Sequence, residues 1–291
     1  MFSRMIADMM VAPSSSPVFN NPSDHDLSYS DVSFSTQDGV ELSGWLIKGS
    51  KEKVIIQTHF GVQCSRSGYT PKDKGMIRPW KQDINFLRQA KTFVDQGYTV
   101  LMYDMRHHGN SGSGKNPWIT WGEEEGRDVV AAVDFISNHP DYKQAKIGLM
   151  SICMGASASI WGFARKKGLA NYPNIKAMIL VQPLRYAVFA KKLGIPKFLA
   201  KSANKYNMKR GGADLFQSFF KYVSRVSVPT MVIQNTNDPW TNLEALESFY
   251  NQLPVEKEMM LIELEKNRFA AYDWIGVNAD KYLPFFAKHM K

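Results

Sequence analysis

The chain has 291 residues, of which 44% are hydrophobic and 12% aromatic, and it carries a formal net charge of +9. This composition excludes an intrinsically disordered chain and suits one large α/β domain with a buried core. Two cysteines are too few for a disulfide framework and lack metal-ligand spacing, and no apolar run reaches the length of a membrane span. We therefore expect a cytoplasmic protein with no metal and no cofactor.

Apolar strands and amphipathic helices alternate along most of the sequence. Residues 1–28 are rich in Ser, Pro and Asn and are expected to be irregular after a short helix, with one domain following at 29–291. The pattern predicts strands at 30–34, 40–47, 53–58, 98–103, 145–150, 177–181, 230–234 and 259–264, and helices at 84–96, 123–138, 155–167, 243–252 and 278–289. This alternation indicates βαβ crossovers and a mostly parallel sheet with helices on both faces.

Residues 184–226 interrupt the alternation between two predicted strands, and their place suggests an inserted helical cap. The segment holds ten Lys and Arg residues and one acid, so it accounts for the whole net charge. Such a basic surface could attract an anionic or carrier-linked acyl substrate, or contact an acidic membrane surface. The alternative is a solvated lysine-rich face. No nucleic-acid-binding motif is present, so we expect no nucleic-acid partner.

The segment 147–156 combines an apolar strand, a tight turn and small residues that open a helix. It has the frame of a nucleophile elbow, G-x-S-x-G, with Cys153 at the nucleophile position and Ser151 at the first glycine. The turn would place one side chain at the N-terminus of the next helix, whose amides and dipole stabilise a thiolate. Cys153 is thus the candidate nucleophile, although an inert buried cysteine is the alternative. Cys64 lacks such a context and is expected to be structural.

Four motifs, in this order, resemble the α/β-hydrolase superfamily from about residue 29 to the C-terminus. They are His59-Phe60-Gly61, the run Tyr103 to Ser111, the stretch Trp121 to Val129, and the strand and turn Gln234 to Pro239. The resemblance implies an α/β-hydrolase fold with a mostly parallel central sheet. It also implies that Asp238 is the triad acid and that the backbone amides of Phe60 and Met154 form the oxyanion hole. A cysteine at the elbow is similar to dienelactone hydrolases.

The position where the resemblance implies a catalytic histidine holds another residue. The loop expected at 264–273 contains no histidine, and Arg268 takes its place. A guanidinium is protonated at any working pH, so it cannot act as a general base. Arg268 could instead pair with Asp238 or bind a carboxylate or phosphate. Among the remaining histidines, His107 and His59 are the candidate bases.

Three hypotheses for function follow from this incomplete triad. In the first, Cys153 acts on an ester, thioester or related small-molecule acyl substrate, because a thiolate needs less help from a base than a serine does. In the second, the pocket supports lyase-like chemistry and Arg268 binds an anion. In the third, the chain is a pseudoenzyme that keeps the fold for binding.

Overall fold

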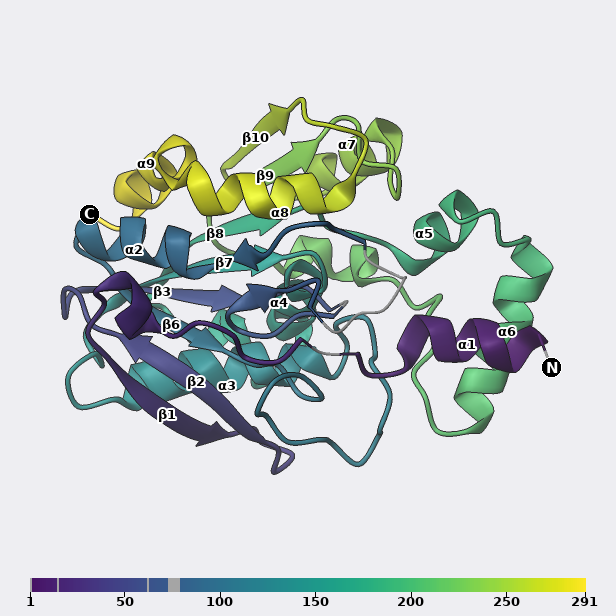
Figure 1. Cartoon of the computed structure of the whole chain (residues 1–291), viewed down its shortest axis with the longest axis horizontal. Coiled ribbons are helices and arrows are strands. Elements are labelled where there is room, and N and C mark those ends of the chain that lie inside the picture. Colours follow the sequence, from purple (N-terminus) through teal and green to yellow (C-terminus); the bar gives the residue numbers. More distant parts are fainter. Residues whose placement is uncertain (1, 15, 62, 73–78) are drawn as a thin grey trace.

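The computed structural model describes residues 2–14, 16–61, 63–72 and 79–291, and its centre is a twisted sheet (Figure 1). The eight strands of this sheet lie in the order β1-β2-β6-β3-β7-β8-β9-β10. β1 pairs antiparallel with β2 and β2 antiparallel with β6, whereas every pair from β6 to β10 is parallel. The strands are β1 Tyr29–Ser35, β2 Glu41–Ile47, β3 Lys53–Thr58, β6 Thr99–Tyr103, β7 Lys146–Ile152, β8 Ile175–Val181, β9 Thr230–Asn235 and β10 Lys257–Ile262, and a small hairpin is formed by β4 Gly68–Tyr69 and β5 Ile84–Asn85.

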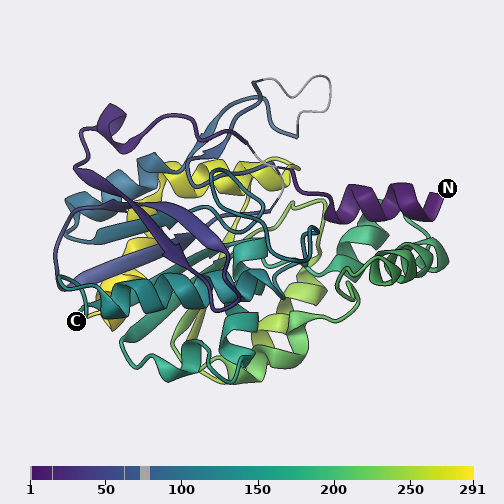
Figure 2. The same cartoon turned by 90° about the horizontal axis from the view of Figure 1, so that it is seen from below.

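Helices cover both faces of the sheet, as Figures 1 and 2 show. In β6, Val100 and Met102 belong to the apolar layer beneath α2, α8 and α9, while Leu101 and Tyr103 belong to the layer that includes α3, α4 and α7. This period of two is what a strand buried on both faces requires. The helices are α2 Leu87–Asp95, α3 Glu125–Asn138, α4 Met154–Ala164, α7 Leu243–Asn251, α8 Arg268–Val277 and α9 Ala279–His289. The predicted mostly parallel α/β architecture is confirmed.

The prediction was wrong at 264–273, where a loop was expected. Helix α8 begins at Arg268, and the side chain of Asn267 caps it by accepting a hydrogen bond from the Phe269 amide at 2.9 Å. Phe269, Tyr272 and Ile275 recur every three residues and are buried against the sheet. The N-terminus of α8, rather than a loop, therefore places Arg268.

A cap lies beyond the carboxyl ends of the parallel strands (Figure 1). Residues 184–226 connect β8 to β9 and form α5 Tyr186–Lys192, α6 Lys197–Lys209 and a 3₁₀ helix, η3, at Phe219–Arg225. Among the described residues, none of the helices combines the length and apolar composition that crossing a bilayer requires.

The N-terminal segment begins with a helix, as expected, and this helix packs against the predicted cap. Helix α1, Phe2–Val11, is in contact with α6, which crosses it in Figure 1. The hydroxyl groups of Ser3 and Ser202 join the two helices at 2.8 Å. The apolar cluster that they share contains Ile6, Ala7, Met10, Val11, Tyr186, Ala190, Ala200, Ala203 and Leu215. Local sequence patterns do not reveal a contact between residues this far apart in the chain, such as Ser3 and Ser202.

The helix that follows the elbow packs unusually close to the sheet. A Cβ atom added at Gly155 would lie 2.6 Å from the carbonyl oxygen of Thr58 and 3.0 Å from that of His59. Both contacts are to backbone atoms, so no side-chain rotation relieves them. Glycine at this position lets α4 bring its first amides next to the loop after β3.

Gly155→Ala is therefore expected to lower the free energy of unfolding by about 1–3 kcal/mol through overpacking. Gly276→Ala is the matched control, because the added Cβ in helix α8 meets only ordinary contacts. The control should be neutral or stabilising by up to about 1 kcal/mol. Urea unfolding of both variants measures the difference, and equal stabilities would contradict the close approach.

Candidate active site

Cys153 lies at the sharp turn between β7 and α4. Its backbone has φ 54° and ψ −102°, a left-handed conformation that is strained for a residue with a Cβ. The Cys153 amide donates to the Val181 carbonyl at 2.8 Å, which fixes the turn against β8. Helix α4 begins at Met154, so its first amides have no carbonyl partner within the helix and point toward the turn. This is the geometry of a nucleophile elbow, with a side chain that is 9% exposed.

Arg268 is completely buried and each arm of its guanidinium is engaged. Nη1 forms an ion pair with Oδ2 of Asp238, Nε donates to the Tyr272 hydroxyl at 2.6 Å, and Nη2 donates to the Gln182 carbonyl. The Gln182 amide returns a hydrogen bond to the Arg268 carbonyl at 2.9 Å. The Gln234 amide donates to Asp238 Oδ2 at 3.2 Å. Asp238 and Arg268 are thus brought together, as an arginine–carboxylate pair.

The side chains of Arg268 and Tyr272 lie close enough to the side chain of Cys153 to interact with it electrostatically. Burial alone would lower the pKa of Arg268, but Asp238, Tyr272 and Cys153 together raise it above its ordinary value. Burial also raises the pKa of Tyr272 well above 10. At neutral pH the sulfur therefore faces a cation and a phenol that keeps its proton, and neither group can act as a base.

His59 cannot be the base, which corrects one of the two histidine predictions. It is buried, its Nδ1–H donates to the Phe60 carbonyl at 2.7 Å, and its Nε2 accepts from the Met105 amide at 3.0 Å. Burial, helped by the neighbouring His108, lowers the pKa of His59 well below 6.5. Both ring nitrogens are thus used to hold the loop after β3 against the end of β6.

His107 is not brought to the elbow. Among the described residues, it is not one of those that line the cavity at Cys153. Burial lowers its pKa, and its backbone N–H donates to the Gly112 carbonyl at 3.0 Å. Its role as a base stays a prediction without support from this geometry.

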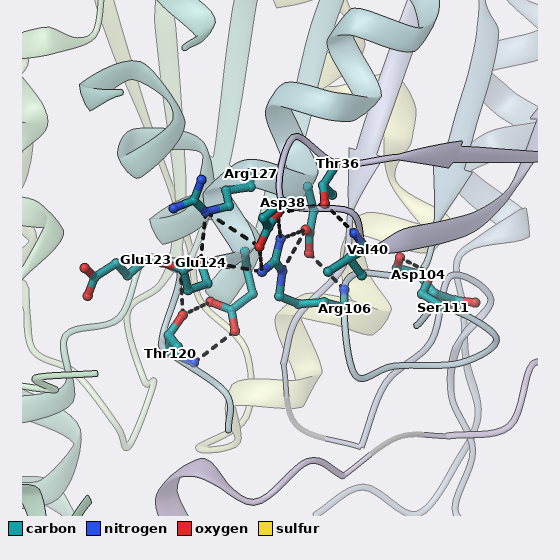
Figure 3. Close-up of polar contacts among 12 residues, drawn as sticks. Thr36, Asp38, Val40, Asp104, Arg106, Ser111, Thr120, Glu123, Glu124 and Arg127 are labelled. Carbon is teal, nitrogen blue, oxygen red and sulfur yellow. Dashed lines mark hydrogen bonds and ion pairs between the residues drawn. The ribbon is translucent and has the colours of Figure 1, made fainter. Parts of the chain in front are cut away.

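The run from Tyr103 to Ser111 serves as a scaffold (Figure 3). Asp104 accepts hydrogen bonds from the Arg66 side chain at 2.6 Å and from the backbone amides of Arg66 at 2.6 Å and Asn110 at 2.9 Å. Arg106 donates to Asp128 at 2.8 Å and to Asp38 at 2.9 and 3.0 Å, which joins β6, α3 and the β1–β2 turn. Asp104, Arg106 and Asp128 are buried, and their contacts position the strand ends.

The predicted oxyanion-hole residues border the cysteine. Phe60 stacks on Tyr272 with ring centroids 4.4 Å apart, and Gly61 lines the same cavity as Cys153 and Met154. A Cβ at Gly61 would lie 2.6 Å from the Met154 sulfur, so the loop and the elbow are in contact. The loop and the start of α4 therefore meet at the place where an oxyanion would form.

An apolar cavity of about 90 Å³ adjoins the sulfur. Its walls come from distant parts of the chain: Met9 and Met10 on α1, Leu184 and Phe189 at the cap, and Trp240 after β9. Such a cavity suits an aliphatic or otherwise apolar acyl group.

Comparison with known proteins places this geometry in a known fold. No family model matches the chain. The solved structure of the Pyrococcus furiosus esterase Pf2001 superimposes with a TM-score of 0.66 and 23% identity, covering 96% of this chain and 100% of that one. The chain has the α/β-hydrolase fold.

Two curated relatives of this α/β-hydrolase-fold protein match part of it. The polyketide transferase grgF of Penicillium sp. is 31% identical over 158 residues, which are 53% of this chain and 45% of the relative. The thiohydrolase aneE of Aspergillus aculeatus is 25% identical over 173 residues, or 60% of this chain and 47% of the relative. The aligned stretches thus span less than half the length of either relative.

Sequence reasoning missed Tyr272 and Gln182. Tyr272 stands four residues after Arg268, a spacing that places both on one helix face, but only once α8 is known to be a helix. Gln182 directly follows β8 with φ 49°, at the carboxyl edge of a parallel sheet where functional groups gather. A polar residue directly after an apolar strand was the available signal.

Removing one partner of the Arg268–Asp238 pair should be costly, since it leaves a buried charge alone. Arg268→Met and Asp238→Leu are each expected to lower the free energy of unfolding by about 3–5 kcal/mol. The double variant should lose less than the sum of the two, because it removes both charges. Chemical denaturation of the four proteins tests this, and strict additivity would show that the pair is not coupled.

Proposed function

We propose that the chain is an acyl-transfer enzyme that uses the Cys153 thiolate without a general base. The observation that carries the proposal is the elbow geometry of Cys153, which lies at the N-terminus of α4 beside the apolar cavity and close to the Arg268–Asp238 pair. The buried cation of Arg268 supplies a positive potential near this elbow. The N-terminal amides of α4 act in the same direction.

The first step needs no proton transfer. The thiolate attacks the carbonyl carbon of an ester or thioester, the Met154 amide and the loop at Phe60 stabilise the oxyanion, and the alkoxide or thiolate of the donor leaves. The acyl group is then held on Cys153 as a thioester. The apolar cavity receives its chain.

The second step decides between transfer and hydrolysis. Water must lose a proton to attack, and the residues around Cys153 include no base to accept it. A thiol acceptor that is already ionised can attack directly, which restores the Cys153 thiolate and releases a new thioester. We therefore infer that acyl transfer to a thiol is favoured over hydrolysis. The similarity to a polyketide transferase and a thiohydrolase supports acyl chemistry of this kind.

The lyase-like alternative is less well supported. Asp238, Tyr272 and Gln182 already accept hydrogen bonds from the three nitrogens of the Arg268 guanidinium. The side chain is also completely buried, so it is poorly placed to bind a substrate carboxylate or phosphate.

Restoring the missing base should convert the protein into a faster hydrolase. Arg268→His places an imidazole beside Asp238, and steady-state hydrolysis of p-nitrophenyl butyrate is expected to rise about tenfold or more. Arg268→Gln is the matched control and should give no gain. Circular dichroism confirms that both variants are folded.

Cys153→Ala in the Arg268→His background should abolish that gain. If Arg268→His hydrolyses no faster than Arg268→Gln while both are folded, the elbow is not poised for nucleophilic attack. The pseudoenzyme hypothesis would then take the place of the proposal.

A further inference from the structure

Helix α1 has two apolar faces, and only one of them is used inside the protein. The inner face is buried against the cap. On the outer face Phe2, Met5 and Met9 follow one another at helical spacing and are 70%, 61% and 61% exposed. The described part of the chain leaves most of the surface of these three side chains uncovered. A second apolar face of this kind costs solubility unless another surface receives it.

Helix α6 adds a further aromatic side chain at the same tip. Phe198 is 71% exposed, and Ser202, one turn further along α6, contacts Ser3 next to Phe2. The two exposed phenylalanines therefore flank a single contact between α1 and α6. Figure 2 shows both helices projecting together from the body of the molecule.

The charge around this tip is positive and largely uncompensated. Two acids lie near it. Asp8 forms an ion pair with Arg210, and Asp214 accepts a hydrogen bond from the Asn204 side chain at 2.7 Å. The exposed cations on α5 and α6 are Lys191, Lys192, Lys197, Lys201, Lys205 and Lys209. Large apolar side chains among lysines are the pattern of a helix that rests in the interface of an anionic bilayer.

The same surface borders the entrance to the catalytic cavity. Met9 is exposed on the outer face of α1 and also lines the cavity that contains Cys153. We infer that the tip formed by α1 and α6, with Phe2, Met5, Met9 and Phe198 at its centre, docks on an anionic lipid membrane. An acyl chain carried in that membrane would then enter the cavity beside Met9.

A lipid surface fits this tip better than an acidic carrier protein does. A carrier would pair with the lysines but would leave several bulky apolar side chains facing a charged partner. A bilayer interface receives both kinds of side chain at once: apolar groups at the acyl boundary and lysines at the headgroups. The docking on a membrane does not depend on the proposed reaction of Cys153, whereas the entry of an acyl chain rests on that proposed function.

Sedimentation with vesicles tests the inference on the full chain. Vesicles that contain phosphatidylglycerol should bind it, whereas vesicles of phosphatidylcholine alone should bind it at least about tenfold more weakly, and added salt should weaken the binding. Phe2→Ser/Phe198→Ser and Lys197→Glu/Lys201→Glu should each lose about tenfold or more in partitioning.

The controls carry the same chemical changes on the main domain. Val277→Ser/Leu261→Ser removes exposed apolar side chains, and Lys143→Glu/Lys166→Glu makes the same change in net charge. Both should bind like the unchanged protein. Loss of binding in these controls, or retention in the tip variants, would overturn the inference. Absence of vesicle binding would also overturn it. In that case, binding to an acidic acyl carrier protein would identify a carrier as the partner, and a dimer seen by light scattering that Phe2→Ser/Phe198→Ser abolishes would identify a second copy of the chain.

Discussion

A buried positive charge at Arg268 is the constraint on which the active-site region depends. Removing a guanidinium from water costs several kcal/mol unless its hydrogen bonds are replaced. The replacements come from three separate elements: Gln182 after β8, Asp238 after β9 and Tyr272 on α8. The carboxyl ends of these strands and the start of α8 are thereby held together beside the elbow.

The same charge determines what the elbow can do. In a Ser–His–Asp arrangement the acid orients a base, and that base activates the nucleophile. Here the acid orients a permanent cation, so the nucleophile has to be a group that carries its own negative charge. Cysteine can meet this condition with the help of Arg268, Tyr272 and the α4 amides, whereas serine cannot. In the proposed reaction this arrangement leaves out the proton-transfer step.

The fold and the elbow could be predicted because both depend on local sequence patterns. Buried parallel strands are continuous apolar runs, and the turn at Cys153 needs small residues on its helix side. The partners of Cys153 could not be predicted, because Tyr272 comes within reach only through the packing of α8 on the sheet. The sequence also could not show that His59 is unavailable as a base. Its ring nitrogens bind the Phe60 carbonyl and the Met105 amide, and these contacts form only when the strand ends are assembled. The docking of α1 on α6 is likewise a long-range contact.

The central claim is that the acyl group leaves Cys153 for a thiol more readily than for water. The most direct measurement follows the products from an acyl thioester in the presence of N-acetylcysteamine, and separates transferred thioester from free acid by liquid chromatography. The account predicts that the transferred thioester is the main product and that it disappears in Cys153→Ala. Free acid as the main product of the unchanged protein, or transfer that persists in Cys153→Ala, would contradict it.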